Sequence, residues 1–269
     1  MIKRFLLLII ILTINNLSCP SKVEYLPAPQ NIGIAAEYDG LSIRITWEPD
    51  TINQPDGYII YFNNQPIDTV KSFINSGYIH NKPATTGRYY LIEYKGSILS
   101  GPSDEVSSIP LPGIDLPVRE INSRNPNGFG LSRDSGQSTS HPMYDSSNIS
   151  GVDFYLTNYR SDSTSQPYYI ASPNLIPTDS TIKWQLLGTM HTNGFFGPLS
   201  GSLTEIDTLP NSGYYSKCSI TPGRVYALYT QDGFFALISI VDLDSIGGKI
   251  LVRPLFQPVR NLRLFKTPD

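Results

Sequence analysis

Three histidines are the side chains of this 269-residue chain best suited to hold a metal ion or a haem: His80, His141 and His191. His141 precedes a proline and His191 follows a methionine, and both fall in loop-like stretches of the second half of the chain. Imidazole nitrogens ligate zinc, copper and haem iron, so this pair could supply two axial haem ligands or half of a metal site. No spacing signature brings the two together, and the sequence therefore predicts no metal site and no cofactor.

Two acidic pairs have the spacing that places both carboxylates on one face of a strand. Glu205 and Asp207 form the first pair, and Asp242 and Asp244 form the second. Residues two apart on a strand share a face, so either pair could bind Ca²⁺ or act as the carboxylate pair of a glycosidase. Two glycines follow the second pair closely, which is typical of a strand that runs into a solvated turn. We expect carboxylates that face water.

The hydroxyl and thiol nucleophiles lack the surroundings that would activate them. A serine hydrolase of the strand–turn–helix type carries its serine in Gly-x-Ser-x-Gly, whereas the nearest string here is Gly197-Pro-Leu-Ser200-Gly201, with no helix predicted behind it. Cys19 and Cys218 are the two cysteines, too few for a four-thiolate zinc site. We predict no catalytic residue and a chain that is not an enzyme. Cys218 is expected to pack as a small apolar side chain.

Five pairs of adjacent aromatic residues offer a different chemistry, that of ring stacking: Tyr89-Tyr90, Tyr168-Tyr169, Phe195-Phe196, Tyr214-Tyr215 and Phe234-Phe235. Neighbouring residues on a strand point to opposite faces, so one ring of each strand-borne pair should face outward. Exposed rings can stack on sugars or anchor a protein partner. The candidate binding residues are Tyr168, Tyr169, Phe195 and Phe196, together with the loops around 124–142 and 190–201. The alternative is that loops or a neighbouring domain cover these rings.

The composition indicates which scaffold would carry these residues. The chain has 17 Tyr, 11 Phe, 22 Pro and 21 Gly, with only 16% charged residues, which is typical of β-sheets joined by tight turns. It has 20 basic and 23 acidic residues, and without Lys3 and Arg4 the balance is 18 against 23. A negative net charge argues against nucleic acid as a partner.

The first nineteen residues predict where the protein works. Lys3 and Arg4 precede the apolar run Phe5–Ile14. Ten residues rise only about 15 Å as a helix, roughly half of a bilayer core, so the run has the length of a signal peptide. Leu17-Ser18-Cys19 resembles the lipobox of bacterial lipoproteins, which implies cleavage after residue 18 and lipid on Cys19. Plain secretion and an uncleaved anchor are the alternatives.

Alternating strand patterns follow a short tether at 19–26. In Leu41–Glu48 the odd positions are apolar and the inner face ends on Trp47, as expected of a half-buried strand. Pro55-Asp56-Gly57 predicts a turn before a strand over 58–62. Another strand is expected at 89–94, where the pattern leaves open which of its two faces is buried.

The motifs of this first half occur together in one known family. They are the prolines before the first strand, Trp47, Asp56-Gly57-Tyr58-x-x-Tyr61, the tyrosine-rich segment 89–94 and Ser100-x-Pro-Ser103. With them, positions 27–109 resemble a fibronectin type III domain. The resemblance implies a seven-stranded sandwich that needs no disulfide and serves as an interaction or spacer module.

The rest of the chain is predicted to form a proline-rich linker at 110–118 and a second β-rich domain at 119–269. Its start, 119–148, is poor in apolar residues and is predicted to be loop-rich. Asp232-Gly233 between two alternating runs predicts a hairpin, and 249–253 and 259–265 predict further strands. Segment 181–187 could be a strand or a short helix. Asp153–Leu156, Ile170–Pro173 and Tyr226–Gly233 weakly resemble a C-terminal module of bacterial envelope lipoproteins, some of which bind haem.

These observations converge on an all-β fold: a fibronectin type III-like seven-stranded sandwich followed by a second β-sandwich-like domain. The predicted function is that of a non-enzymatic, lipid-anchored cell-envelope protein, in which the first module is a spacer and the second domain binds a glycan or a protein. The alternatives are an accessory protein of a surface hydrolase and a haem- or metal-binding envelope lipoprotein.

Overall fold

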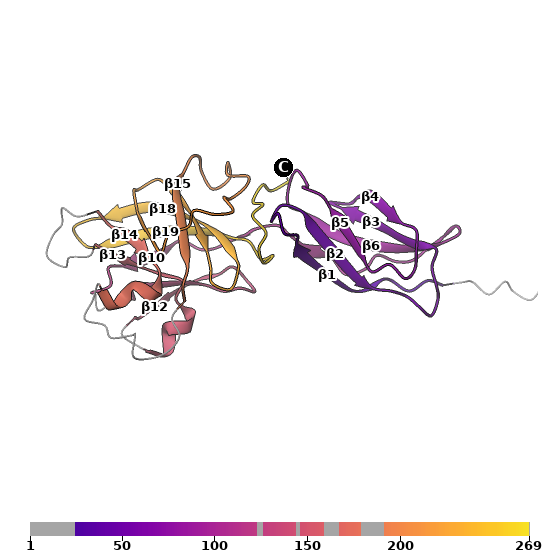
Figure 1. Cartoon of the computed structure of the whole chain (residues 1–269), viewed down its shortest axis with the longest axis horizontal. Helices are drawn as coiled ribbons and strands as arrows, with labels where there is room; N and C mark the ends of the chain where they lie inside the picture. The colour runs from indigo at the N-terminus through magenta and orange to yellow at the C-terminus, as the bar shows by residue number, and fades with distance from the viewer. Residues whose placement is uncertain (1–24, 123–125, 144–145, 159–166, 179–190, 269) are drawn as a thin grey trace, which may run out of the picture.

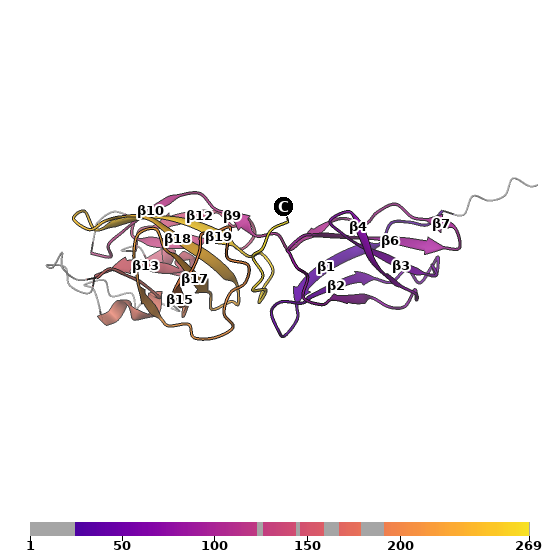
Figure 2. The same cartoon turned by 90° about the horizontal axis from the view of Figure 1, so that it is seen from above.

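A computed structural model describes residues 25–122, 126–143, 146–158, 167–178 and 191–268. The chain is an all-β protein whose two lobes lie end to end (Figures 1 and 2). The helices among the described residues are two short 3-10 turns, η1 (Ser146–Gly151) and η2 (Pro173–Thr178). Within that part of the chain, no helix has the length and apolar character required to cross a membrane. Cys19 and the segment 181–187 lie outside the described residues.

The first lobe is a sandwich of two antiparallel sheets. One sheet has the order β1 (Gln30–Ala36), β2 (Ile43–Glu48), β5 (Gly77–His80). The other has the order β4 (Gln65–Val70), β3 (Gly57–Phe62), β6 (Arg88–Lys95), β7 (Ile98–Leu99), with β8 (Val106–Ser107) also paired to β6. The alternation of β2 buries Ile43, Ile45 and Trp47 as predicted, and Trp47 is only 4% exposed. On β6 the buried face is that of Tyr89, Leu91 and Glu93.

The second lobe is a sandwich whose two sheets share one core. The larger sheet has the order β10 (Leu116–Arg119), β19 (Lys249–Phe256), β18 (Phe235–Asp244), β17 (Val225–Tyr229), β15 (Gly194–Leu199), and β9 (Leu111–Pro112) pairs with β19. The smaller has the order β12 (Ser138–His141), β11 (Gly128–Leu131), β13 (Phe154–Thr157), β14 (Tyr169–Ala171), β16 (Lys217–Ser219). The predicted hairpin is confirmed, because β17 pairs with β18 around Gly233, whose φ is +88°.

Two expectations for the start of the second lobe are wrong. The predicted linker 110–118 belongs to the larger sheet, since β9 and β10 both pair with β19. The predicted loop-rich segment 119–148 contains β11 and β12, which pair with each other in the smaller sheet. Glycine hides the strand signal in β11: a Cβ at Gly130 would lie 1.9 Å from the carbonyl oxygen of Gly151. Close backbone approach takes the place of side-chain packing there.

The last residues depart most from expectation, because several of them pack against the first lobe, while Phe265 stays in a core cluster of the second. The strand predicted at 259–265 does not form, and only Leu264 makes an isolated bridge, with Thr208. Val259, Leu262 and Leu264 instead join the core that contains Trp47 and Tyr58. We call residues 257–266 the C-terminal strap. The predicted domain 119–269 is therefore not one packing unit.

Backbone hydrogen bonds tie the C-terminal strap to both lobes. On the side of the first lobe, the N–H of Arg263 donates to the carbonyl of Gly40 at 2.7 Å, and the N–H of Thr86 donates to the carbonyl of Lys266 at 2.7 Å. On the other side, the N–H of Phe265 donates to the carbonyl of Asp207 at 2.7 Å, and that of Asn261 to Gly233 at 2.7 Å. The strap thus forms the junction, and the chain ends between the lobes (Figure 1).

Candidate functional site

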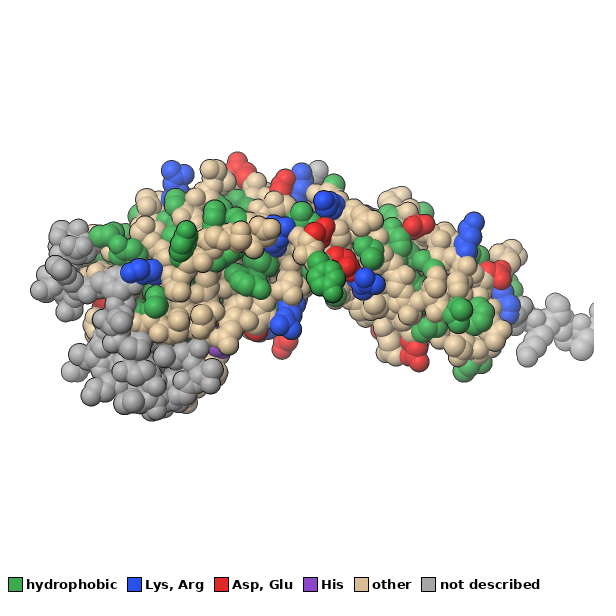
Figure 3. Space-filling model, viewed as in Figure 1, with side chains coloured by type: hydrophobic (Ala, Val, Ile, Leu, Met, Phe, Trp, Pro, Cys, Tyr) green, Lys and Arg blue, Asp and Glu red, His purple; other side chains and the backbone are tan. Residues whose placement is uncertain are grey.

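A cleft of about 750 Å³ lies where the two lobes meet. Its volume falls within the range of small-molecule sites, about 300–1,000 Å³. Charged side chains of both signs gather on the surface over this junction (Figure 3). The residues that line the cleft come from the first lobe, the C-terminal strap and the second lobe: Ala36, Glu37, Tyr38, Asp39, Gly40, Leu41, Arg44, Lys82, Asn211, Tyr214, Tyr229, Phe235, Asn261 and Arg263.

The wall from the first lobe is the turn between β1 and β2. The carboxylate of Asp39 accepts hydrogen bonds from the N–H groups of Leu41 at 2.9 Å and Ser42 at 2.8 Å, and from the Ser42 hydroxyl at 2.9 Å. Burial by itself would raise the pKa of Asp39, but these hydrogen bonds hold the pKa below its ordinary value. The turn is thereby fixed around an ionised carboxylate. Tyr38, at its tip, is fully exposed.

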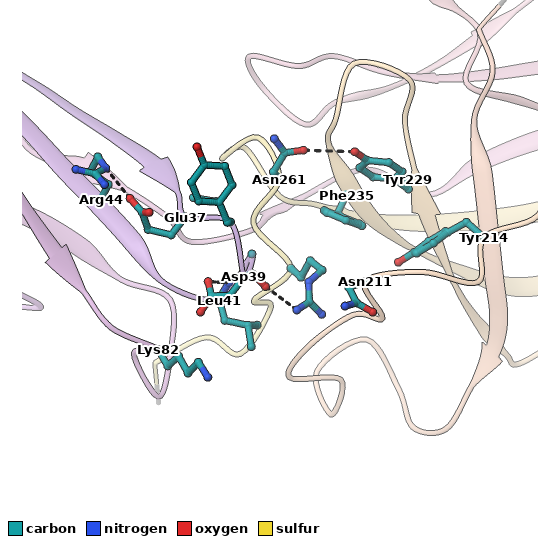
Figure 4. A pocket seen from close by; sticks show the side chains of 14 residues that line it. Glu37, Asp39, Leu41, Arg44, Lys82, Asn211, Tyr214, Tyr229, Phe235 and Asn261 are labelled. Carbon is teal, nitrogen blue, oxygen red and sulfur yellow. Dashed lines mark hydrogen bonds and ion pairs between the residues drawn. The ribbon is translucent and has the colours of Figure 1, made fainter.

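The wall from the second lobe is a cluster of three rings. Tyr229 stacks on Phe235 with centroids 4.5 Å apart, and Tyr214 contacts both rings at 5.8 and 6.0 Å. The hydroxyl of Tyr214 donates to the carbonyl of Pro210 at 3.0 Å, and the hydroxyl of Tyr229 donates to Asn261 Oδ1 at 3.4 Å. Figure 4 shows these rings facing Asp39 and Lys82 across the cleft. The wall offers aromatic faces with polar groups at their edges.

Arg263 of the C-terminal strap supplies positive charge to the cleft. Its Nη2 donates to the carbonyl of Asp39 at 2.7 Å, and its Nη1 donates to the carbonyl of Leu209. Both partners are neutral, and no carboxylate among the described residues forms an ion pair with Arg263 or Lys82. Glu37, by contrast, is paired with Arg44 at 2.5 Å. Lys82 is close enough to Asp39 for its charge to help lower the pKa of that carboxyl group. The cleft therefore combines aromatic rings, amide groups and three cations with two carboxylates, and the charge of Arg263 is the one available to an anionic ligand.

Sequence reasoning did not single out this cleft, and two of its own candidate residues prove to be core residues. Tyr168 is 6% exposed and Phe195 is 0% exposed, so the prediction that they bind a ligand is wrong. The alternation argument itself is correct, because their neighbours Tyr169 and Phe196 are less buried. Yet Phe196 packs on Tyr214 at 6.0 Å, and Tyr169 lies 5.7 Å from the amine of Lys217. A ligand role for Tyr169 and Phe196 stays a prediction.

The histidines and acidic pairs of the sequence are dispersed over the fold. His80 Nδ1 lies 3.0 Å from the hydroxyl of Tyr89 in the first lobe, while His141 packs over Gly151 in the second. Asp207 pairs with Lys266 at 3.4 Å, and Asp244 accepts a hydrogen bond from the N–H of Gly247 at 2.8 Å. No group of three potential metal ligands occurs in the part of the chain that the structure describes.

A buried ion pair in the second lobe escaped the sequence analysis. Asp153 is 1% exposed and receives two hydrogen bonds from Arg133, at 2.7 and 2.9 Å. Arg133 also donates from its Nε to the carboxylate of Asp232, in the β17–β18 turn, at 2.8 Å. His191 Nδ1 lies 3.7 Å from Asp153 Oδ1. Burial opposes the charge of Asp153, but the hydrogen bonds and charge of Arg133 keep its pKa below the ordinary value. The one feature of the sequence that could have indicated this ion pair is an acidic residue at the start of an otherwise apolar strand, in Val152-Asp153-Phe154.

The fold and the cleft define a class, that of two-lobed β-sandwich proteins with an open cleft at the lobe junction. No protein-family model matches the chain, and no curated protein matches it. Among solved structures, the chain is similar to the crystal structure of a DUF4466 family protein from Parabacteroides merdae, with a TM-score of 0.41 and 11% identity over 86% of this chain and 99% of that one. A similarity of this size carries no conclusion about function.

Proposed function

We propose that this protein is a non-enzymatic, lipid-anchored cell-envelope protein that binds an acidic saccharide in the cleft between its lobes. The observation that carries the proposal is the pairing of the Tyr214–Tyr229–Phe235 ring cluster with the unneutralised charge of Arg263. Aromatic faces stack on sugar rings, a guanidinium matches a carboxylate, and the amides of Asn211 and Asn261 suit sugar hydroxyls.

The placement of the chain ends supports a spacer role for the first lobe. Its two sheets, ordered β1-β2-β5 and β4-β3-β6-β7, are the arrangement that we propose as a fibronectin type III-like module. The first described residues lie at the end of this lobe that is far from the junction (Figure 1). An anchor at Cys19 would attach to that far end through a short tether. The cleft would then be held away from the membrane by the length of one sandwich.

Binding should weaken when exposed groups of the cleft are removed. Tyr38→Ala and Lys82→Gln are each expected to raise the Kd for an acidic oligosaccharide roughly tenfold, equivalent to about 1.4 kcal/mol. The Tyr38 side chain makes no hydrogen bond to another residue that the structure describes, and Tyr25→Ala, at an exposed tyrosine away from the cleft, is the matched control. The measurement is a glycan array with acidic and neutral oligosaccharides, followed by titration calorimetry. Unchanged binding in both cleft variants, or selective binding of acidic peptides, would refute the saccharide proposal.

Lipidation at Cys19 should decide the location of the protein. Expressed with its signal peptide in a bacterial host, the Cys19→Ala chain is expected to leave the membrane fraction, because the several acyl chains of a lipoprotein hold a protein far more stably than one. The measurement is fractionation combined with incorporation of labelled fatty acid. A Cys19→Ala protein that stays in the membrane without label would show that the apolar run Phe5–Ile14 is itself the anchor.

A further inference from the structure

A buried carboxyl group lies at the far end of the first lobe, away from the cleft. Glu93 follows Tyr89 and Leu91 on the inward face of β6, so the alternation that builds the core also carries a carboxyl group inward. Glu93 is 1% exposed, and its Oε2 is buried without a hydrogen-bond partner among the described residues. A buried carboxylate without a partner is costly, which makes this position unusual for a spacer domain.

Glu93 lines a cavity of about 270 Å³. The apolar part of its wall comes from Pro27, Pro49 and Ile52, and the polar part includes Glu48 and Asp50. Asp50 is already committed to its own turn: it accepts hydrogen bonds from the N–H groups of Ile52 at 3.0 Å and Asn53 at 2.8 Å, and from the Asn53 amide at 2.7 Å.

The basic side chain that follows Glu93 on the same strand is used elsewhere. Lys95 stands two residues after Glu93 on β6, and its Nζ donates to the carbonyl of Asn53 at 2.9 Å. Glu48 accepts from the side-chain amide of Asn31. The cavity thus combines the carboxyl groups of Glu48, Asp50 and Glu93 with apolar side chains, and no basic side chain among the described residues forms an ion pair with Glu93.

We propose that this cavity binds a primary alkylammonium group, with the ammonium paired to Glu93 and the alkyl chain against Pro49 and Ile52. A lysine ammonium is compact and sits on a flexible four-carbon stem, which fits a small cavity whose carboxyl group has no hydrogen-bond partner at Oε2 among the described residues. A quaternary ammonium would need an aromatic cage, and no aromatic side chain is among the described residues that line this cavity. The source is either the lysine of a partner protein or a free amine.

The protonation state of Glu93 makes the proposal measurable. Burial, and secondarily the charge of Asp50, raise the pKa of Glu93 from 4.5 to about 7. The folded state therefore holds this proton more tightly than the unfolded state, so stability should fall as pH rises from about 4.5 to 7 and level off above it. A bound ammonium favours the ionised form, so it should lower this pKa and bind more tightly above pH 7. The neighbouring ionisable groups are Glu48, Asp50, Lys95 and Tyr58, and burial raises the pKa of Tyr58 further above its ordinary value of 10.0.

The test is titration of the Glu93 carboxyl carbon by NMR, using the chain from residue 20 onward at constant ionic strength. With n-butylamine or with N-acetyl-lysine methylamide, which separate a free amine from a peptide lysine, the pKa of Glu93 should fall by one unit or more. The Tm at pH 8 should rise by several degrees. n-Butanol, of the same shape without the charge, should do neither.

Glu93→Gln should abolish the amine-dependent rise in Tm and the loss of stability between pH 4.5 and 7, whereas Glu105→Gln, at an exposed carboxylate paired with Arg88, should keep both. Two results would overturn the proposal. One is a Glu93 pKa that neither amine moves. The other is a pKa near 4.5 in the free protein that rises in Lys95→Met, which would show that Lys95 occupies the site.

Discussion

A chain that ends at residue 256 is expected to lose the cooperative fold of its first lobe, although every strand of that lobe lies before residue 108. The truncation removes Val259, Leu262 and Leu264 from the core around Trp47 and exposes the apolar surface beneath them. Leu→Ala changes in a core cost about 2–5 kcal/mol each. Losing three such side chains together approaches the whole stability of a small domain, about 5–15 kcal/mol.

Single substitutions make this expectation quantitative. Leu262→Ala, at a side chain that is 0% exposed, should lower the free energy of unfolding by about 2–5 kcal/mol. Lys266→Ala is the control, because its ion pair with Asp207 is exposed and worth at most about 1 kcal/mol. Urea unfolding followed by Trp47 fluorescence in a Trp184→Phe background reports on the first lobe. An unchanged urea midpoint in Leu262→Ala would mean that the C-terminal strap contacts the first lobe without contributing to its stability.

Loss of the buried carboxylate in the second lobe should have a comparable effect. Asp153→Ala is expected to destabilise the protein by about 3–5 kcal/mol, because it leaves the guanidinium of Arg133 without its bidentate partner. Asp153→Asn, which keeps the shape and removes the charge, should be nearly as severe. Asp232→Asn is the matched control: it contacts the same guanidinium, but its side chain is 48% exposed, and the expected cost is below about 1 kcal/mol.

The pH dependence of this pair has a definite sign. The pKa of Asp153 is lowered by folding from 3.8, so its stabilisation is present above pH 3.8 and is lost as pH falls through the lower value of the folded state. Urea unfolding of the wild type and Asp153→Asn at pH 7 and at pH 2–3 measures this. The two curves should converge in acid. A difference that persists unchanged in acid would contradict this prediction and show that the negative charge of Asp153 is not what stabilises the fold.

Patterns of neighbouring residues were sufficient to predict the strands and turns that those residues themselves form. The alternation in Leu41–Glu48 predicts the burial of Trp47, and Asp232-Gly233 predicts the β17–β18 hairpin; both are confirmed. The two faces of segment 89–94 could not be distinguished, because one carries Glu93 and the other carries Ile92 and Tyr94. Hydrophobicity alone would favour burying the second face. The partner strands and the core around Tyr89 decided otherwise.

The sequence by itself determined the class of the fold, the turns and the apolar positions, because strand period and turn chemistry are properties of neighbouring residues. Only the tertiary structure decided which core an apolar segment joins. Leu262 and Leu264 look like the inner face of one more strand in the second lobe, yet they complete the first. The same is true of the cleft, whose walls lie more than a hundred residues apart in the chain. The hydrophobic effect removes apolar side chains from water but is not directional. The residues adjacent in sequence therefore do not specify which distant surface will cover a given apolar side chain.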